Sequence, residues 1–188
     1  MSLDIVMGPM FAGKSSLAIQ RLRREMYLNT KCCVITSALD TRYDSAGRSL
    51  QTHDESGGYP AIGLKVLQEA FTLVAFLDAS FVVIDEAQFF PDLYEAVMMM
   101  VEGYKKKVLV VGLDGDSNRM PFDQIQRLIS KADTCEKLTA LCSMCKDGTP
   151  GIFSLRFASA EGQICVGGKD KYAAVCRKHY LGYHATAS

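Results

Sequence analysis

Eight residues near the N-terminus constrain the fold and chemistry of this chain more than any other feature. They read Gly8-Pro9-Met10-Phe11-Ala12-Gly13-Lys14-Ser15 and match the pattern G-x-x-x-x-G-K-[ST] in full. A short apolar run at residues 3–7 precedes them, and a helical pattern at about residues 15–29 follows them. Glycines in this context let backbone N–H groups face an anion, and the helix adds the positive end of its dipole. We therefore predict a phosphate-binding loop for a nucleotide, with Lys14 on the β- and γ-phosphates and the Ser15 hydroxyl on Mg²⁺.

A pair of acidic residues supplies a second signature. Asp85 and Glu86 directly follow the apolar run Phe81–Ile84, which we interpret as a buried strand. At the carboxyl end of a strand in a nucleotide-binding sheet, an Asp can hold Mg²⁺ directly or through water. Glu86 can then face the γ-phosphate from the acceptor side and take a proton from water or from an acceptor hydroxyl. A solvated turn would also explain such a pair, so the assignment depends on the loop at residues 8–15.

Apolar runs alternate with helical patterns over the first 130 residues. Strands are expected at residues 3–7, 32–35, 81–84 and 108–111, and helices at 15–29, 65–78, 91–104 and 121–130. Residues 40–58 are polar and are expected to form a long loop. Strands that are apolar throughout indicate the α/β class, a parallel sheet with helices on both faces. The alternation ends near residue 133, so we expect a nucleotide-binding domain at 1–134 and a small lobe at 135–188.

The predicted C-terminal lobe carries a potential metal site. Its ligands follow the spacing Cys142-x₂-Cys145-x₃₀-Cys176-x₂-His179, which forms two short clips. Four nitrogen and sulfur ligands of this kind fit a tetrahedral structural zinc, with no open position for catalysis. A single C-x₂-C would leave unrelated buried thiols as an equally good explanation, and the second clip favours a metal. We therefore expect one structural Zn²⁺ per chain.

Composition argues against several other classes of protein. The 188 residues include 21 Lys and Arg and 21 Asp and Glu, so the formal net charge is zero, whereas a general binder of nucleic acid would be basic. Hydrophobic residues make up 48%, which is too many for a mostly disordered chain. The sequence has no secretory signal pattern and no stretch near the roughly 18 apolar residues of a membrane span. We expect a soluble, intracellular protein that binds neither nucleic acid nor membrane.

Beyond these motifs, the sequence resembles the zinc-containing thymidine kinases of animals, many bacteria and large DNA viruses. The resemblance spans nearly the whole chain, and its blocks occur in the order found in that family. Besides the phosphate-binding loop and the metal clips, the matching segments are residues 40–43, 52–54, 85–91, 113–115, 137–140 and 168–180. The block at residues 168–180 is very specific to this family. The family implies a P-loop sheet with a zinc-binding lobe and a lasso loop.

The resemblance implies an enzyme that uses Mg-ATP to phosphorylate the thymidine 5′-hydroxyl, which gives dTMP for DNA synthesis and ADP. It implies that Glu86 is the general base, that Arg42 lies near the transferred phosphate, and that Asp40 helps to position the reacting groups. Nucleoside contacts are implied for Met10, Phe89, Ser117, Ser154 and Tyr172, and for a lasso of Gln163, Ile164, Cys165, Val166 and Gly167 that binds thymine mainly through its backbone. Family members are commonly homotetramers, are often inhibited by dTTP, and are cytoplasmic.

Two departures from the family pattern concern the substrate and metal sites. Many relatives have Thr-Phe where this chain has Asp116-Ser117, so an aromatic wall beside the nucleoside is missing. His179 stands where most relatives have Cys, and it remains a good zinc ligand. Residues 85–88 also resemble a helicase motif, but helicases need two motor domains, and this chain has room for one. The alternative that remains is an ATP-switched zinc module that binds a macromolecule and performs no small-molecule chemistry.

Overall fold

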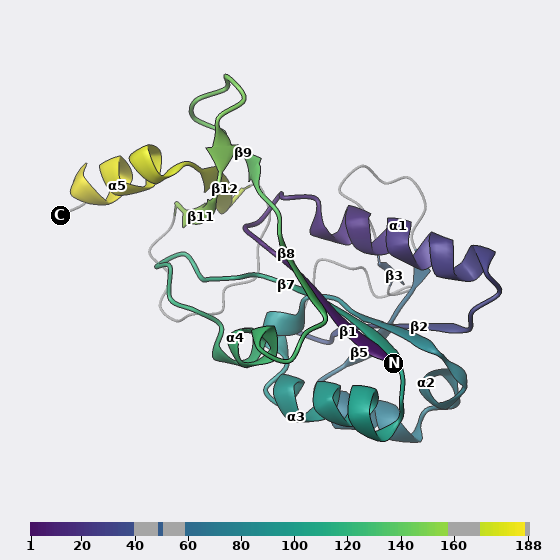
Figure 1. Cartoon of the computed structure of the whole chain (residues 1–188). Coiled ribbons are helices and arrows are strands. Elements are labelled where there is room, and N and C mark those ends of the chain that lie inside the picture. Colours follow the sequence, from purple (N-terminus) through teal and green to yellow (C-terminus); the bar gives the residue numbers. More distant parts are fainter. Residues whose placement is uncertain (40–48, 51–58, 158–169, 187–188) are drawn as a thin grey trace.

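The computed structural model describes residues 1–39, 49–50, 59–157 and 170–186. Its centre is a parallel sheet (Figure 1). Among the described residues this sheet has six strands, in the order β5-β2-β6-β7-β1-β8. The strands are β1 (Ser2–Met7), β2 (Cys32–Ser37), β5 (Ile62–Leu64), β6 (Phe81–Ile84), β7 (Lys107–Gly112) and β8 (Thr134–Lys137). The four strands expected from apolar runs are therefore confirmed, as is the α/β class.

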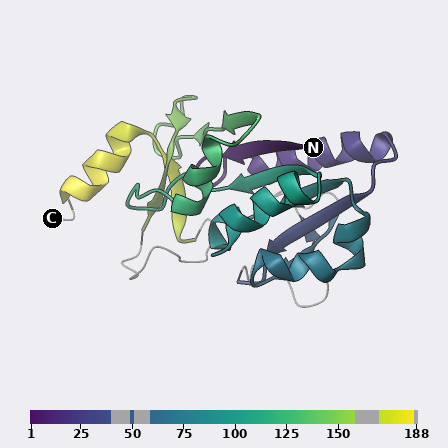
Figure 2. The ribbon, with the colours of Figure 1, turned by 60° about the horizontal axis from the view of Figure 1, so that its bottom comes forward.

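Helices cover both faces of this sheet because its strands are apolar on both sides. The helix α1 (Lys14–Tyr27) packs on one face through Ala18, Ile19 and Leu22. The opposite face carries η1 (Leu67–Thr72), α2 (Val74–Asp78), α3 (Leu93–Met98) and α4 (Asp123–Ile129) (Figure 2). Central strands contribute to both cores: in β7, Val108 and Val110 face one cluster, whereas Leu109 and Val111 face the other. Period-two alternation within an all-apolar strand produces this arrangement.

Two expected helices differ from the structure in detail. The predicted helix at 65–78 is divided into η1 and α2, because Leu73 between them is extended, with φ −85° and ψ 128°. The buried Lys106 lies at the end of α2, where its Nζ donates to the carbonyl oxygens of Leu77 (3.1 Å) and Ala79 (2.6 Å). The predicted helix at 91–104 begins at Leu93 and continues after α3 as a π-helical turn, Met99–Gly103.

The C-terminal part is a smaller unit with its own apolar core. It contains the hairpin β9 (Ala140–Leu141) and β10 (Pro150–Gly151), the pair β11 (Phe153–Arg156) and β12 (Tyr172–Val175), and the helix α5 (Arg177–Thr186). Its core includes Cys142, Leu155, Val175 and Tyr180. A separate domain from residue 135 stays a prediction, and β8 at Thr134–Lys137 still belongs to the main sheet. A further pair, β3 (Ser49–Leu50) and β4 (Tyr59–Pro60), lies outside this sheet.

No helix among the described residues is both long enough and apolar enough to cross a membrane.

Candidate active site

The loop between β1 and α1 has the backbone that a phosphate-binding loop requires. Phe11 (φ 64°) and Gly13 (φ 79°) adopt left-handed conformations, and Gly13 is the N-cap of α1. A Cβ atom at Gly8 would overlap with the Leu138 carbonyl oxygen, so only glycine fits where the loop leaves β1. Left-handed positions turn successive N–H groups towards one side, and α1 directs its N-terminus to the same place. Lys14, the first residue of α1, donates from Nζ to the Pro9 carbonyl oxygen at 2.7 Å.

The loop meets the end of β6 through Ser15 and Asp85. The Ser15 hydroxyl donates to Asp85 Oδ2 at 3.2 Å, so the two residues expected to hold Mg²⁺ lie side by side. Asp85 is only 2% exposed, and burial, reinforced by the neighbouring Glu86, raises the pKa of its carboxyl group to about 7. Lys14 and Ser15 oppose this rise in pKa. A divalent cation would favour the ionised form further, because its charge reverses the effect of burial.

Glu86 is held by a residue to which the sequence analysis gave no role. Its backbone is left-handed, with φ 50° and ψ 42°, and Asp85 alone separates it from the buried strand β6. Gln88, itself buried, donates from Nε2 to Glu86 Oε2 at 2.5 Å, and its Oε1 accepts the Leu113 N–H at 3.0 Å. The second bond fixes which end of the amide faces Glu86. The motif at residues 85–91 contains Gln88, but its distant partner at the end of β7 is visible only in three dimensions.

Some of the residues expected to contact the nucleoside lie close together, and they link the phosphate-binding loop to the C-terminal lobe. The Met10 N–H donates to the hydroxyl of the buried Ser154 at 3.0 Å, so β11 touches the phosphate-binding loop. Tyr172 pairs with Arg156, two residues from Ser154, which puts Tyr172 and Ser154 on one face of the β11–β12 pair. Phe89 ends the short helix η2 (Ala87–Phe89) after Glu86 and is 9% exposed.

Ser117 lies in the turn that follows β7 and is buried. Its carbonyl oxygen accepts the Tyr180 hydroxyl of α5 at 2.7 Å. An ion pair between Lys137 and Asp114, with Nζ and Oδ2 2.6 Å apart, links the loop after β7 to β8. The remaining expected site residues lie outside the described residues; they are Asp40, Arg42, Gln163, Ile164, Cys165, Val166 and Gly167.

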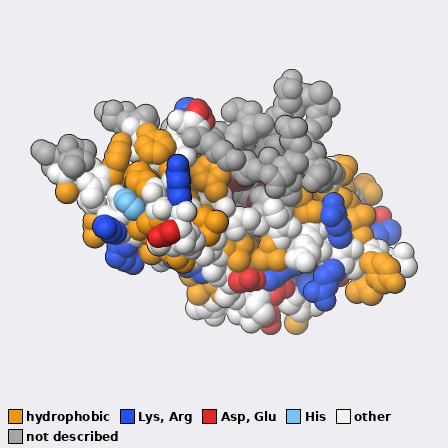
Figure 3. All heavy atoms as spheres, turned by 90° about the horizontal axis from the view of Figure 1, so that it is seen from above, with side chains coloured by type: hydrophobic (Ala, Val, Ile, Leu, Met, Phe, Trp, Pro, Cys, Tyr) orange, Lys and Arg blue, Asp and Glu red, His pale blue; other side chains and the backbone are white. Residues whose placement is uncertain are grey.

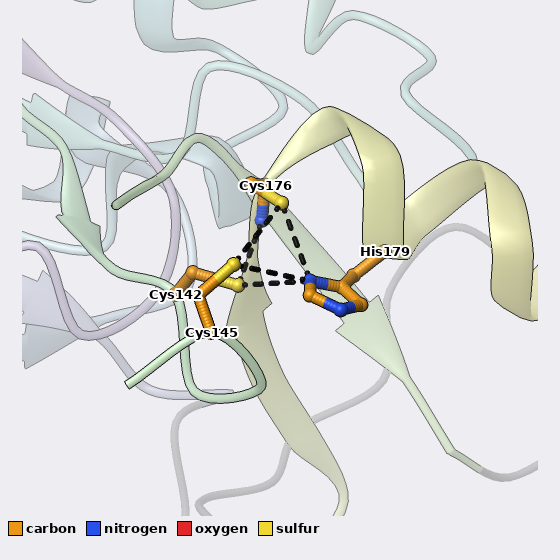
Figure 4. Close-up of side chains that lie close together, drawn as sticks. All are labelled: Cys142, Cys145, Cys176 and His179. Atoms are coloured by element: carbon orange, nitrogen blue, oxygen red, sulfur yellow. Dashed lines mark hydrogen bonds between the residues drawn. The ribbon is translucent and has the colours of Figure 1, made fainter. Parts of the chain in front are cut away.

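The four predicted metal ligands converge in the C-terminal lobe, as Figure 4 shows. The potential ligand atoms of Cys142, Cys145, Cys176 and His179 all lie within 4.8 Å of one another. The β9–β10 hairpin supplies the first clip, and the start of α5 supplies the second. His179 directs Nδ1 at the three sulfur atoms, at 3.5, 3.3 and 3.3 Å.

The donor set of this cluster fits a structural zinc. A tetrahedral zinc with bonds of about 2.3 Å to sulfur separates its sulfur ligands by about 3.8 Å. The Cys145 and Cys176 sulfur atoms are 3.8 Å apart. Burial raises the pKa of the Cys142 thiol, but hydrogen bonds from the backbone N–H groups of Cys176, Cys145 and Met144 outweigh it and lower the pKa to about 6. A thiolate, the form that binds zinc, is therefore favoured at Cys142, whereas burial raises the pKa of the Cys145 thiol to about 11, so a bound zinc would itself have to favour the thiolate there.

Sequence comparisons with known proteins point to one family. The model of the family described as thymidine kinase matches residues 1–180. Thymidine kinase a of Arabidopsis thaliana is 39% identical over 97% of this chain and 76% of its own length, and the thymidine kinase of Monkeypox virus is 39% identical over 95% and 96%. The cytosolic thymidine kinase of Cricetulus griseus is 39% identical over 95% of this chain and 73% of its own length. The chain thus belongs to the thymidine kinase family.

Proposed function

We propose that this protein transfers the γ-phosphoryl group of Mg-ATP to the 5′-hydroxyl of thymidine, which gives dTMP and ADP for DNA synthesis. The observation that carries the proposal is the contact between Ser15 of the loop and Asp85, the residue before Glu86. The contact joins two oxygen donors that suit Mg²⁺ and sets them next to an acid able to accept a proton. Membership of the family identifies the acceptor as thymidine.

The roles of the residues follow from what phosphoryl transfer requires, which is positioning and neutralisation of charge. Backbone N–H groups of the loop hold the phosphates, and Lys14 neutralises the β- and γ-phosphates. Ser15 and Asp85 hold Mg²⁺, which supplies further positive charge when bound. Glu86 takes the proton of the 5′-hydroxyl as that oxygen bonds to the γ-phosphorus and ADP leaves. The family resemblance adds Arg42 at the transferred phosphate and Asp40 in positioning.

Gln88 supports the proposed role of Glu86 as the general base. Its Nε2 group donates to one carboxylate oxygen of Glu86 and so helps to set the orientation of the carboxylate that is proposed to accept the proton. Gln88 is in turn fixed by the backbone of Leu113 at the end of β7. A base whose direction is set in advance costs no reorganisation during the reaction.

The nucleoside is proposed to bind where the lobe meets the sheet. The link between Met10 and Ser154 supports this position, because both residues are expected to contact the nucleoside. Phe89, Ser117 and Tyr172 are proposed to complete the pocket, and residues 163–167 to cover thymine as a lasso. A structural zinc held by Cys142, Cys145, Cys176 and His179 anchors both ends of the segment that contains this lasso.

The family resemblance also leads us to propose a cytoplasmic homotetramer that is inhibited by dTTP. Neither nucleic acid nor membrane is proposed as a partner. On the face drawn in Figure 3, the Lys and Arg side chains of the described residues are scattered and form no continuous basic strip. The formal net charge of zero supports a small-molecule acceptor, because a general binder of a phosphate backbone would be basic.

The experiment that tests the proposal is ADP release from Mg-ATP, measured with and without each nucleoside. We expect release to depend on thymidine and dTMP to appear in equal amount. ATP turnover that is indifferent to thymidine would contradict the proposal and favour an ATP-switched zinc module. A Ser15→Ala variant provides a control for the metal-dependent step, because it removes one of the two proposed Mg²⁺ ligands.

A further inference from the structure

Tyr180 connects the metal cluster to the loop that follows β7. It directly follows His179 in α5, and its side chain is 3% exposed. Its N–H donates to the Cys176 carbonyl oxygen at 3.0 Å, so the first turn of α5 joins it to two of the four potential metal ligands. At the other end, its hydroxyl donates to the Ser117 carbonyl oxygen at 2.7 Å, in a bond that is buried.

The turn that receives this bond is organised around Asp116. The buried carboxylate of Asp116 accepts the N–H groups of Asn118 and Met120, both at 2.8 Å, and the Asp116 N–H donates to the Met120 carbonyl oxygen at 2.9 Å. A fourth bond, from the Arg119 N–H to the Asp116 carbonyl oxygen at 3.0 Å, completes the network that ties residues 116–120 into one turn. The Tyr180 hydroxyl thus bonds to a backbone carbonyl group inside this turn.

Aromatic and cationic groups hold the Tyr180 ring in place. The Phe153 ring has its centroid 5.2 Å from that of Tyr180, and the Arg119 guanidinium carbon lies 4.7 Å from the Tyr180 centroid. Arg119 belongs to the same turn, so the turn and the ring are in contact at two points. Phe153 precedes Ser154, whose hydroxyl accepts the Met10 N–H of the phosphate-binding loop. The ring thus lies between the metal cluster and two segments proposed to bind the nucleoside.

We propose that Tyr180 is a positioning residue through which the metal cluster fixes the turn at 116–120, and with it the affinity for the nucleoside. A metal at Cys176 and His179 holds the first turn of α5, which aims the Tyr180 hydroxyl at Ser117. The proposed restraint on the turn at 116–120 depends only on the contacts that Tyr180 makes. Its consequence for nucleoside affinity rests on the proposed function.

Tyr180→Phe tests this proposal, because it removes the hydroxyl and keeps the ring. Tyr183→Phe is the matched control, since Tyr183 lies on the same helix and its hydroxyl donates to the Phe157 carbonyl oxygen at 3.2 Å, in an exposed bond. In Tyr180→Phe we expect zinc content to stay unchanged and hydrogen exchange at the amides of Asn118 and Met120 to become about 2- to 10-fold faster, as expected for one neutral hydrogen bond. Tyr183→Phe should leave exchange at these amides unchanged.

Kinetics and zinc removal extend the test to the nucleoside. In Tyr180→Phe the KM for thymidine should rise by a similar factor, while the KM for ATP and kcat stay close to those of the unsubstituted protein. Chelation of zinc should accelerate exchange at 116–120 in the unsubstituted protein, and should accelerate it less in Tyr180→Phe, where the link is already broken. Unchanged exchange at 116–120 in Tyr180→Phe would overturn the proposal. If exchange changes and no thymidine-dependent turnover exists in the unsubstituted protein, the coupling stands and the proposed function fails.

Discussion

Glu86 has a left-handed backbone conformation that residues other than glycine rarely adopt. A left-handed residue of this kind costs on the order of 1 kcal/mol or more, and such strain gathers at functional sites. Here this conformation sets the direction in which the Glu86 carboxylate points. Asp85 continues the line of β6 into the buried contact with Ser15, whereas the turn at Glu86 places the next carboxylate against Gln88. Two adjacent acids thereby have different surroundings and can have different tasks.

Replacement of Glu86 tests this division of tasks. Glu86→Gln should retain ATP binding and lose about 10²- to 10⁴-fold in kcat, the usual contribution of a positioned base. Thymidine-dependent ADP release and calorimetric titration with ATP measure the two effects. Glu95→Gln is the control, because Glu95 is exposed and pairs with Arg127 on the surface at 3.1 Å. Near-normal turnover in a folded Glu86→Gln protein would remove Glu86 as the base.

At the scale of elements, the parts that the sequence predicted are those with a strong local signal. Apolar runs predicted β1, β2, β6 and β7, and the spacing of the motifs predicted which residues meet at Ser15 and at the metal cluster. The strand β8 was missed because all four of its residues are exposed at the edge of the sheet, so it has no apolar run. The roles of Gln88 and Tyr180 were missed because their partners, Leu113 and Ser117, are distant in the sequence.

Gly112 at the end of β7 allows a test of whether the sheet, through Gln88, orients Glu86, the proposed base. A Cβ atom at Gly112 would lie 2.7 Å from Ile125 Cδ1 and 2.9 Å from Gln88 Oε1, and both atoms end flexible side chains. Gly112→Ala should therefore fold with a modest loss of stability but displace Gln88 and lower kcat. Adding Ile125→Val should recover stability and leave kcat low, because it relieves only one of the two overlaps. A normal kcat in folded Gly112→Ala would show that Gln88 does not orient Glu86.

Lys106 gives a second test at the scale of elements, because this buried side chain donates hydrogen bonds to carbonyl oxygens at the C-terminal end of α2. Its ammonium group also lies 4.6 Å from the centroid of the Phe76 ring. Lys106→Met keeps the apolar stem but removes the donors to Leu77 and Ala79, so unfolding in urea should show a loss of about 1–3 kcal/mol. This loss corresponds to roughly 2–12 °C in Tm for a chain of this size. Lys131→Met, at an exposed position, should change stability by less than about 0.5 kcal/mol. Equal stability of the two variants would contradict the capping role.

At the scale of the whole molecule, the phosphate-binding loop follows a strand of the main sheet, whereas the metal cluster lies in the C-terminal lobe. Contacts between described residues of the two regions include the hydrogen bonds of Met10 with Ser154 and of Tyr180 with Ser117, and the contact of Arg119 with the Tyr180 ring. Two of them involve residues proposed to contact the nucleoside. Loss of order in the lobe should therefore affect the nucleoside site more than the nucleotide site.

His179 provides the test of this asymmetry. His179→Cys should keep one zinc per chain, since the clip spacing suits either ligand, whereas His179→Ala should lose zinc or bind it more weakly. In His179→Ala, affinity for thymidine should fall more than affinity for ATP, because the loop at residues 8–15 is built by β1 and α1. Metal analysis of the purified variants and separate titrations with each substrate measure these effects. One zinc per chain at unchanged affinity in His179→Ala would show that another group is the fourth ligand, and an equal loss of both affinities would show that the lobe supports the whole site.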